Sequence, residues 1–303
     1  MTIKYRNYNI QKVDDTYKDI FKNQRIKIVN EMRIKYDFLE PKAYTIWEVF
    51  KKLETVRDES DPDTDLPQIV HAWQTAESIK SRYMEEPPAL SKIHICDLFT
   101  RLEWNKLAED VRIKYNTTLD KFYEGIEEWD WFPLIGLIHD LGKVMVETEF
   151  GGLPQWLVVG DIFPLGILLS KEAIFYERGF HLENPDFNTN LYAEHCGFNN
   201  IMFTWSHDQY MAMVLEKNET LLPKEAIYIV RYHSFYSWHT PKEGQNRGYL
   251  EYANKEDWRM LPLLKAFQKA DLYSKTRDVP DSENIKKEYD LLIKKYFKEK
   301  LIW

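Results

Sequence analysis

Along most of the chain, apolar residues return every three or four positions, and stretches rich in proline, glycine and charged residues interrupt them. This spacing is that of one face of an α-helix, so the pattern predicts a mainly α fold. The expected helices are residues 14–36, 43–54, 67–79, 131–143, 198–217, 223–233 and 256–275. Glycines and prolines in 151–164 predict loops with short extended segments, such as 156–159.

The predicted helix 131–143 is apolar around nearly its whole circumference, and it ends in the adjacent pair His139 and Asp140. Asp130 is expected to cap its first turn, and a helix of this composition should run through the core. A buried charge without a partner costs several kcal/mol. His139 and Asp140 therefore need either a hydrogen-bonding partner or a metal ion. Lys143 follows closely enough to reach a metal-bound ligand, although its spacing also suits an ordinary solvated lysine.

Four more polar residues stand inside the apolar helical pattern, namely His71, His207, His233 and Asp271. With the His-Asp pair they make four imidazoles and two carboxylates, a ligand set for one or two transition-metal ions. A structural zinc site would favour thiolates at short spacing, so iron, manganese or a hydrolytic divalent pair fits better. Each histidine could equally be an ordinary packed side chain. The other histidines are expected not to be ligands: His94, His181, His195 and His239.

Composition narrows the class of protein. A net charge of −8 and a pI near 5.6 argue against a nucleic-acid partner, which needs clustered Lys and Arg. Two cysteines in 303 residues suit a reducing compartment, and no apolar run reaches the ~20 residues of a membrane span. The chain also begins without a signal-peptide pattern, so a cytoplasmic protein that does not bind membranes is expected.

Two segments between the predicted helices need separate interpretation. The acidic turn 58–65 resembles the start of a calcium loop, but Leu66 and Ala72 stand where that loop needs Gly and Glu, so calcium is excluded. Residues 85–128 open with two prolines and are highly charged, which predicts a helical surface insertion without chemistry of its own. We therefore expect one domain over 1–303, with this insertion at about 85–128.

The order His71, His139-Asp140, His207, Asp271 resembles that of the HD-domain superfamily, whose helical core binds one or two metal ions. Longer segments narrow the resemblance to the inositol oxygenases, over nearly the whole chain from Tyr5 to Trp303. They are residues 58–63, 71–77, 139–143, 154–156, 158–161, 205–208, 231–236 and 271–273, with the sequences DESDPD, HAWQTAE, HDLGK, PQW, VVGD, WSHD, RYHSFY and DLY.

This resemblance implies a non-haem di-iron oxygenase of inositol catabolism that uses dioxygen to cleave the ring of myo-inositol, giving D-glucuronate. It implies two iron ions in a mixed-valent Fe²⁺/Fe³⁺ state. By similarity, His71, His139 and Asp271 would hold one iron, His207 and His233 the other, and Asp140 would bridge them. An HD-type helical core with additional helices, in a protein that acts as a monomer, is expected.

The resemblance also implies a substrate site. The residues that match the family's substrate contacts are Arg6, Asp58, Glu59, Ser60, Lys143, Gly160, Asp161, His233 and Ser234. Asp140 and Lys143 match its catalytic residues, and Lys143 would stabilise negative charge on a substrate oxygen. Tyr17 matches a tyrosine on a segment that covers the substrate. The departure is the 85–128 insertion, because the family is shorter there.

Two other functions stay open on the sequence. HD-domain phosphohydrolases share the ligand order, but they need a basic pocket for phosphate. Here the candidate cations are only Arg6, Lys143 and Lys275, and the acidic 58–65 turn would repel an anion. The other alternative is a non-catalytic metal-binding scaffold whose function lies in the insertion. The absence of one of the six candidate ligands would have supported this alternative, but all six are present.

Overall fold

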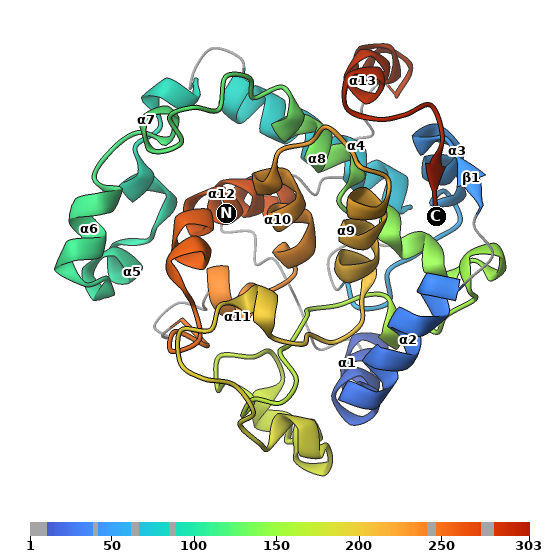
Figure 1. Cartoon of the computed structure of the whole chain (residues 1–303), viewed down its shortest axis with the longest axis vertical. Helices are drawn as coiled ribbons and strands as arrows, with labels where there is room; N and C mark the ends of the chain where they lie inside the picture. Colours follow the sequence, from blue (N-terminus) through green and yellow to red (C-terminus); the bar gives the residue numbers. More distant parts are fainter. Residues whose placement is uncertain (1–10, 39–41, 62–66, 85–88, 241–246, 274–281) are drawn as a thin grey trace.

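The computed structural model describes residues 11–38, 42–61, 67–84, 89–240, 247–273 and 282–303. The expected mainly α fold is confirmed, because helices make up most of these residues (Figure 1). In the described part, the one sheet has two short antiparallel strands, β1 (Ala43–Tyr44) and β2 (Leu301–Ile302). Among the described residues, no helix combines the length and the apolar character needed to cross a membrane.

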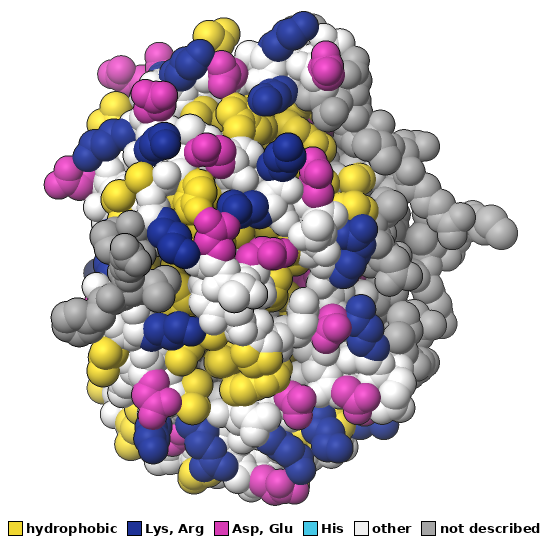
Figure 2. Space-filling view, turned by 90° about the vertical axis from the view of Figure 1, so that its right-hand side faces the viewer, with side chains coloured by type: hydrophobic (Ala, Val, Ile, Leu, Met, Phe, Trp, Pro, Cys, Tyr) yellow, Lys and Arg dark blue, Asp and Glu magenta, His cyan; other side chains and the backbone are white. Residues whose placement is uncertain are grey.

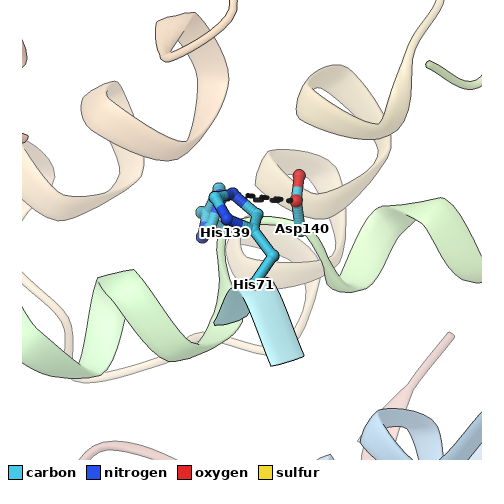
Figure 3. A group of neighbouring side chains, drawn as sticks. All are labelled: His71, His139 and Asp140. Carbon is cyan, nitrogen blue, oxygen red and sulfur yellow. Dashed lines mark ion pairs between the residues drawn. The ribbon is translucent and has the colours of Figure 1, made fainter. Parts of the chain in front are cut away.

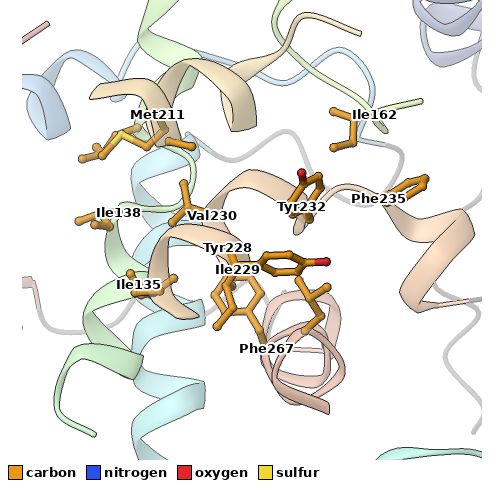
Figure 4. Packing of buried hydrophobic residues seen from close by; sticks show 14 of the residues in the cluster. Ile135, Ile138, Ile162, Met211, Tyr228, Ile229, Val230, Tyr232, Phe235 and Phe267 are labelled. Carbon is orange, nitrogen blue, oxygen red and sulfur yellow. The ribbon is translucent and has the colours of Figure 1, made fainter. Parts of the chain in front are cut away.

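The core is built around α8 (Trp131–Ile138), against which α4 (Gln68–Ile79) and α10 (Lys224–Tyr232) pack. Helix α12 (Lys255–Tyr273) packs on α4 and α10, and α9 (His207–Lys217) packs on α10. Every residue of α8 is buried, as its apolar sequence predicts. Figure 4 shows Ile135 and Ile138 of α8 facing Val230 of α10 and Met211 of α9. Burying one such aliphatic side chain contributes about 1.5–3 kcal/mol. The expected central helix is therefore the most buried element.

Helices α4 and α8 approach closely where α8 carries Gly136. A Cβ atom at this glycine would lie only 2.8 Å from the Cα atom of Ala76 in α4. Any larger residue would push the two helices apart. This contact matters because α4 carries His71 and α8 ends next to His139.

The helix predicted over 14–36 is instead two helices, α1 (Gln11–Asn23) and α2 (Ile26–Phe38). Loop side chains from the middle of the chain separate them. The Asn184 amide donates to the carbonyls of Phe21 and Gln24, and Asp186 accepts from the N–H of Ile26 at 2.8 Å. The apolar periodicity continues through this break, so the sequence pattern could not reveal it.

Four further predicted elements differ from the structure. In 43–54 only α3 (Ile46–Lys52) is helical, because β1 precedes it and Thr45 caps it. In 198–217 the helix is α9 alone, which begins after its capping residue Ser206. The 131–143 helix ends with α8 and continues as a 3₁₀ helix, Leu141–Val146. Residues 156–159 are not extended, because a 3₁₀ turn spans Gln155–Leu157.

Asp130 does not cap α8 as expected. Its carboxylate instead receives Lys295 at 2.6 Å and also the hydroxyl of Tyr296. Both partners belong to α13 (Ser282–Tyr296), a helix that the sequence pattern did not predict. Asp130 therefore ties the start of the central helix to the C-terminal helix.

The remaining elements are short. They are the π-helix Lys80–Met84, α5 (Arg101–Lys106), α6 (Glu109–Tyr115), α7 (Leu119–Phe122), α11 (Tyr236–His239) and the 3₁₀ turns Leu90–Lys92, Ile95–Leu98, Thr148–Phe150, Tyr176–Arg178, Phe180–Glu183, Pro185–Phe187 and Phe198–Asn200.

On the face drawn in Figure 2, basic and acidic side chains are interspersed. A nucleic-acid site would instead group its basic side chains.

Candidate metal centre

Six buried polar side chains, which lie in five helices or directly after them, meet at the C-terminal end of α8. His71 lies within α4, His139 and Asp140 directly follow α8, and His207 is the first residue of α9. His233 directly follows α10, and Asp271 lies near the end of α12. The helix predicted over 198–217 begins only at His207, and the helix predicted over 131–143 ends at Ile138, just before His139 and Asp140.

Asp140 lies at the middle of this group. Its Oδ2 is 3.4 Å from Nε2 of His139 and 3.7 Å from Nε2 of His71, and Figure 3 shows these two rings beside its carboxylate. Its Oδ1 is 3.2 Å from Nε2 of His207 and 3.7 Å from Nε2 of His233. The two carboxylate oxygens therefore face two different pairs of imidazoles.

The second carboxylate, Asp271, belongs to only one of these pairs. Its Oδ1 is 2.8 Å from Nε2 of His71 and 3.6 Å from Nε2 of His139. Burial opposes ionisation of both carboxylates, but the surrounding histidines, together with Lys143 beside Asp140, hold the pKa of Asp140 and of Asp271 well below the usual range. Both carboxylates are therefore anionic at neutral pH, the form that can bind a metal ion.

The outer ring nitrogens fix which nitrogen of each histidine faces the centre. Nδ1 of His139, His207 and His233 lies 2.9, 2.6 and 2.9 Å from the backbone carbonyls of Gly136, Val158 and Val230. A carbonyl can only accept, so each Nδ1 carries a hydrogen and each ring turns its Nε2 atom toward the centre. Hydrogen bonds to the outer nitrogen orient metal-binding histidines in this way.

The contact between His207 and His233 tests whether these residues fit a metal. Their Nε2 atoms are 3.2 Å apart, and two lone pairs at that distance repel unless a cation lies between them. Burial works against a charge on His233, yet Asp208 and Asp140 raise its pKa to about 10. A metal ion that bound both Nε2 atoms would displace the ring proton of His233. The donor set fits a pair of divalent or trivalent ions.

Asp208 was not predicted to have a role, although it stands next to His207 in the sequence. Its side chain is fully buried, with Oδ1 2.9 Å from Nδ1 of His233 and Oδ2 2.9 Å from the hydroxyl of Ser206. It also accepts the backbone N–H of Ser234 at 3.3 Å. Asp208 therefore orients His233 from the side opposite the centre.

Lys143 is buried, contrary to the reading of an ordinary solvated lysine. Its ammonium donates to Oδ2 of Asp140, to Oδ2 of Asp58 and to Oε1 of Gln68, each at 2.8 Å. Burial opposes its charge, but the two carboxylates raise its pKa above the ordinary lysine value. Gln68 was also missed, although it lies one helical turn before His71 and so on the same face of α4.

A cavity of about 430 Å³, counted with its opening to solvent, lies over the six side chains. The predicted substrate contacts that line it are Asp58, Ser60, Lys143, Gly160, Asp161, His233 and Ser234, and Asp61 and Tyr236, which were not predicted, line it too. Tyr17 also lines it, and its hydroxyl donates to Asp161 at 2.6 Å. Glu59 does not line this cavity, and its N–H faces Gln155. Arg6 and Lys275 lie outside the described residues.

Within the cavity wall, Asp58 is held by charge. Its Oδ1 accepts both the N–H and the hydroxyl of Ser60, at 2.8 and 2.5 Å, while its Oδ2 faces Lys143. Burial opposes ionisation, but Lys143 dominates and lowers the pKa of Asp58 to about 2. The 58–61 turn is thus part of the site and not a solvated loop.

Gly142 lets the turn after Asp140 approach α9. A Cβ atom at this position would lie 2.9 Å from the Cα atom of His207 and closer still to its carbonyl oxygen. We expect Gly142→Ala to push His207 away from Asp140, lower stability by about 2 kcal/mol and weaken metal binding. Chemical denaturation and metal titration measure the two effects. Wild-type values for both would contradict this close approach.

Comparison with known proteins adds an independent finding. The family model described as myo-inositol oxygenase matches residues 10–102 and 115–303. "Inositol oxygenase 4" of Arabidopsis thaliana is 37% identical, over 99% of this chain and 83% of that relative. "Inositol oxygenase" of Dictyostelium discoideum and that of Mus musculus are 35% and 34% identical, each over 99% of this chain and 90% of the relative.

Proposed function

Since this chain belongs to the myo-inositol oxygenase family, we propose that it cleaves the ring of myo-inositol with dioxygen to give D-glucuronate. One carbon–carbon bond between two hydroxyl-bearing carbons breaks, and four electrons pass from the substrate to dioxygen. Glucuronic acid has one oxygen atom more than inositol and two hydrogen atoms fewer. The second oxygen atom therefore leaves as water.

Two iron ions, mixed-valent in the working state, are the proposed cofactors. His71, His139 and Asp271 would hold one, His207 and His233 the other, and Asp140 would bridge them. When bound, the ions supply Lewis acidity toward substrate hydroxyls and electrons for dioxygen. The observation that carries this proposal is that the two oxygens of Asp140 face separate pairs of imidazole nitrogens.

The cavity wall suits a neutral polyol. The hydroxyl of Ser234 offers a hydrogen-bond donor, and Lys143 offers another in exchange for one of its present partners. The carboxylates of Asp58 and Asp161 and the hydroxyl oxygen of Ser60 offer acceptors. Lys143, positively charged and buried beside Asp140, would stabilise negative charge on a substrate oxygen as it develops. Tyr17 orients Asp161 through its hydroxyl, and its ring helps to exclude water from the reaction.

The charge of the cavity disfavours a phosphohydrolase. Its lining includes Asp58, Asp61 and Asp161, and the charge of Lys143 is already shared between two carboxylates. A phosphate group binds where cationic donors are free to pair with it. An activity on phosphate esters would therefore need a rearrangement of these groups.

One assay tests the proposed function. Purified protein is loaded with iron without oxygen, partly oxidised, and given myo-inositol and dioxygen. Glucuronate should form with one dioxygen consumed for each product molecule. Phosphate release from phosphate esters, without oxygen consumption, would instead establish the hydrolase.

We further propose that the protein acts in the cytoplasm as a monomer. The mass of the particle in solution tests whether it is a monomer.

Replacing Asp208 tests how the histidines are oriented. In Asp208→Ala, Nδ1 of His233 keeps only its bond to the Val230 carbonyl, and the backbone N–H of Ser234 loses its bond to Asp208. We expect a metal affinity about 10–100-fold weaker, as is usual when such an outer partner is lost. Asp208→Asn keeps one acceptor oxygen and should lose less. Equal affinities in both variants and the wild type would remove Asp208 from the metal centre.

A further inference from the structure

The segment expected as a surface insertion is bound tightly to one helix of the metal centre. Its helices α5, α6 and α7 lie together at one edge of the molecule (Figure 1). Yet Ile95, Tyr115 and Leu119 within it are fully buried, and the Ile95–Leu98 turn packs on α12. These contacts are the reason to ask what the segment does for α12, which carries Asp271.

Helix α12 lacks one of its internal hydrogen bonds, and a side chain of the segment replaces it. Pro262 in its interior has no N–H, so the carbonyl of Trp258 one turn earlier loses its helical partner. The hydroxyl of Tyr115 donates to this carbonyl. At the next residue of α12, the hydroxyl of Tyr123 donates to the carbonyl of Arg259 at 2.6 Å. Two tyrosines of the segment thus complete the hydrogen bonding of α12.

Glu103, in α5, neutralises two cations beside the same helix. Its Oε1 is 2.7 Å from Nζ of Lys265 in α12 and 3.4 Å from Nη2 of Arg247. Both cationic side chains are buried, and each also holds a backbone carbonyl, Lys265 that of His239 and Arg247 that of Trp238. Without Glu103, two positive charges would remain close together in a buried space.

The position of α12 in turn sets several parts of the metal centre. Besides Asp271, the helix carries Gln268, which donates to the carbonyl of His233 at 2.5 Å. It also carries Phe267, whose ring meets that of His139 edge-on at 5.3 Å. A shift of α12 would therefore move one proposed ligand directly and disturb two others.

We propose that residues 93–123 act as a brace for α12, and that Glu103 is a positioning residue for the metal ion held by Asp271. The inference rests on the proposed ligand role of Asp271. Glu103 lies in residues 103–114, which the family match leaves out. The part of the brace that carries Glu103 is thus outside the family match, whereas Tyr115 and Tyr123 lie within it.

The first test compares Glu103→Gln with Glu109→Gln, which changes an exposed glutamate of the same segment. Metal binding is titrated well below the unfolding temperature, with circular dichroism as the check on folding. Glu103→Gln should bind one ion normally and the other at least 10-fold more weakly, while Glu109→Gln binds both as the wild type does. A Glu103→Gln protein that melts earlier but binds both ions normally would overturn the proposal.

A second test covers the case in which Glu103→Gln does not fold. Pro262→Ala restores an N–H that can bond to the Trp258 carbonyl, so the Tyr115 hydroxyl becomes redundant. Tyr115→Phe should weaken binding of one ion several-fold in the wild-type background and leave it unchanged in the Pro262→Ala background. Equal effects in the two backgrounds would exclude the brace.

The proposed function can fail separately from the brace. If the wild-type protein binds fewer than two ions, or if Asp271→Ala keeps both at normal affinity, the proposed ligand set is wrong. If the wild type binds two and Asp271→Ala binds one, the ligand set stands. The Glu103 and Tyr115 variants then decide the brace alone.

Discussion

Asp140→Ala should yield a folded protein that holds at most one metal ion per chain and forms no measurable glucuronate. Asp140 is the residue whose two oxygens face both pairs of imidazoles. Its removal takes the bridging oxygens away and leaves four buried imidazoles with Asp271 as the remaining carboxylate of the predicted set. Metal analysis of the purified variant gives the number of ions, and oxygen consumption gives the activity, which should fall by more than about 10³-fold.

A graded comparison separates loss of the bridge from loss of folding. Asp140→Asn keeps the shape and one good acceptor oxygen, so it should hold one ion and not two. Asp110→Ala, at an exposed position of α6, should bind two ions and keep its activity. Two ions per chain in Asp140→Ala at wild-type affinity would contradict the bridging role.

The candidate site could be predicted from the sequence because burial leaves a mark on it. His71, His139 and Asp140 are polar residues at positions that the apolar pattern assigns to the core. Such residues need partners, whatever the partners are. The structure brings them together, with His207 and His233, as two groups of side chains that could hold a metal ion and that share Asp140. The resemblance to a known family then assigned to each a role that spacing alone could not.

What could not be predicted depends on contacts between distant segments. The break after α1 arises where Gln24 bonds to Trp205 and Asn184 bonds to Gln24, each more than 150 residues away. Periodicity reports which face of a segment is buried, and it carries no information on the partner. For the same reason Asp208 stood without a role, because its bond to His233 crosses from α9 to α10.

The insertion shows the same limit on a larger scale. A segment with many charges and scattered apolar residues is expected to be a surface insertion. Its role depends on Tyr115 and Glu103, whose partners lie on α12, about 140 to 160 residues further along the chain. One clue was present in the sequence, because Pro262 inside an apolar helix implies a carbonyl that needs another donor.

Lys143→Ala should keep both metal ions and lose about 10²–10³-fold in kcat, the usual cost of removing one preorganised charge-stabilising donor. The six proposed ligands remain in this variant, so the metal content should not change. Lys143 is the cation against both Asp140 and Asp58, and its loss would raise the pKa of Asp58 from about 2. The cavity would then hold two close carboxylates without the charged donor that stabilises the developing negative charge.

Two further variants distinguish charge from shape at this position. Lys143→Met fills similar space without charge and should be as slow as Lys143→Ala. Gln68→Ala keeps the lysine but removes one of its three acceptors, so a loss of about 10-fold or less is expected, because the two carboxylates still hold the ammonium. Near-normal turnover in Lys143→Met would remove the charge from the mechanism. If Lys143→Ala instead loses metal, the role of Lys143 is to hold Asp140 in place. A direct role in the reaction is established only if the variant keeps both ions and is still slow.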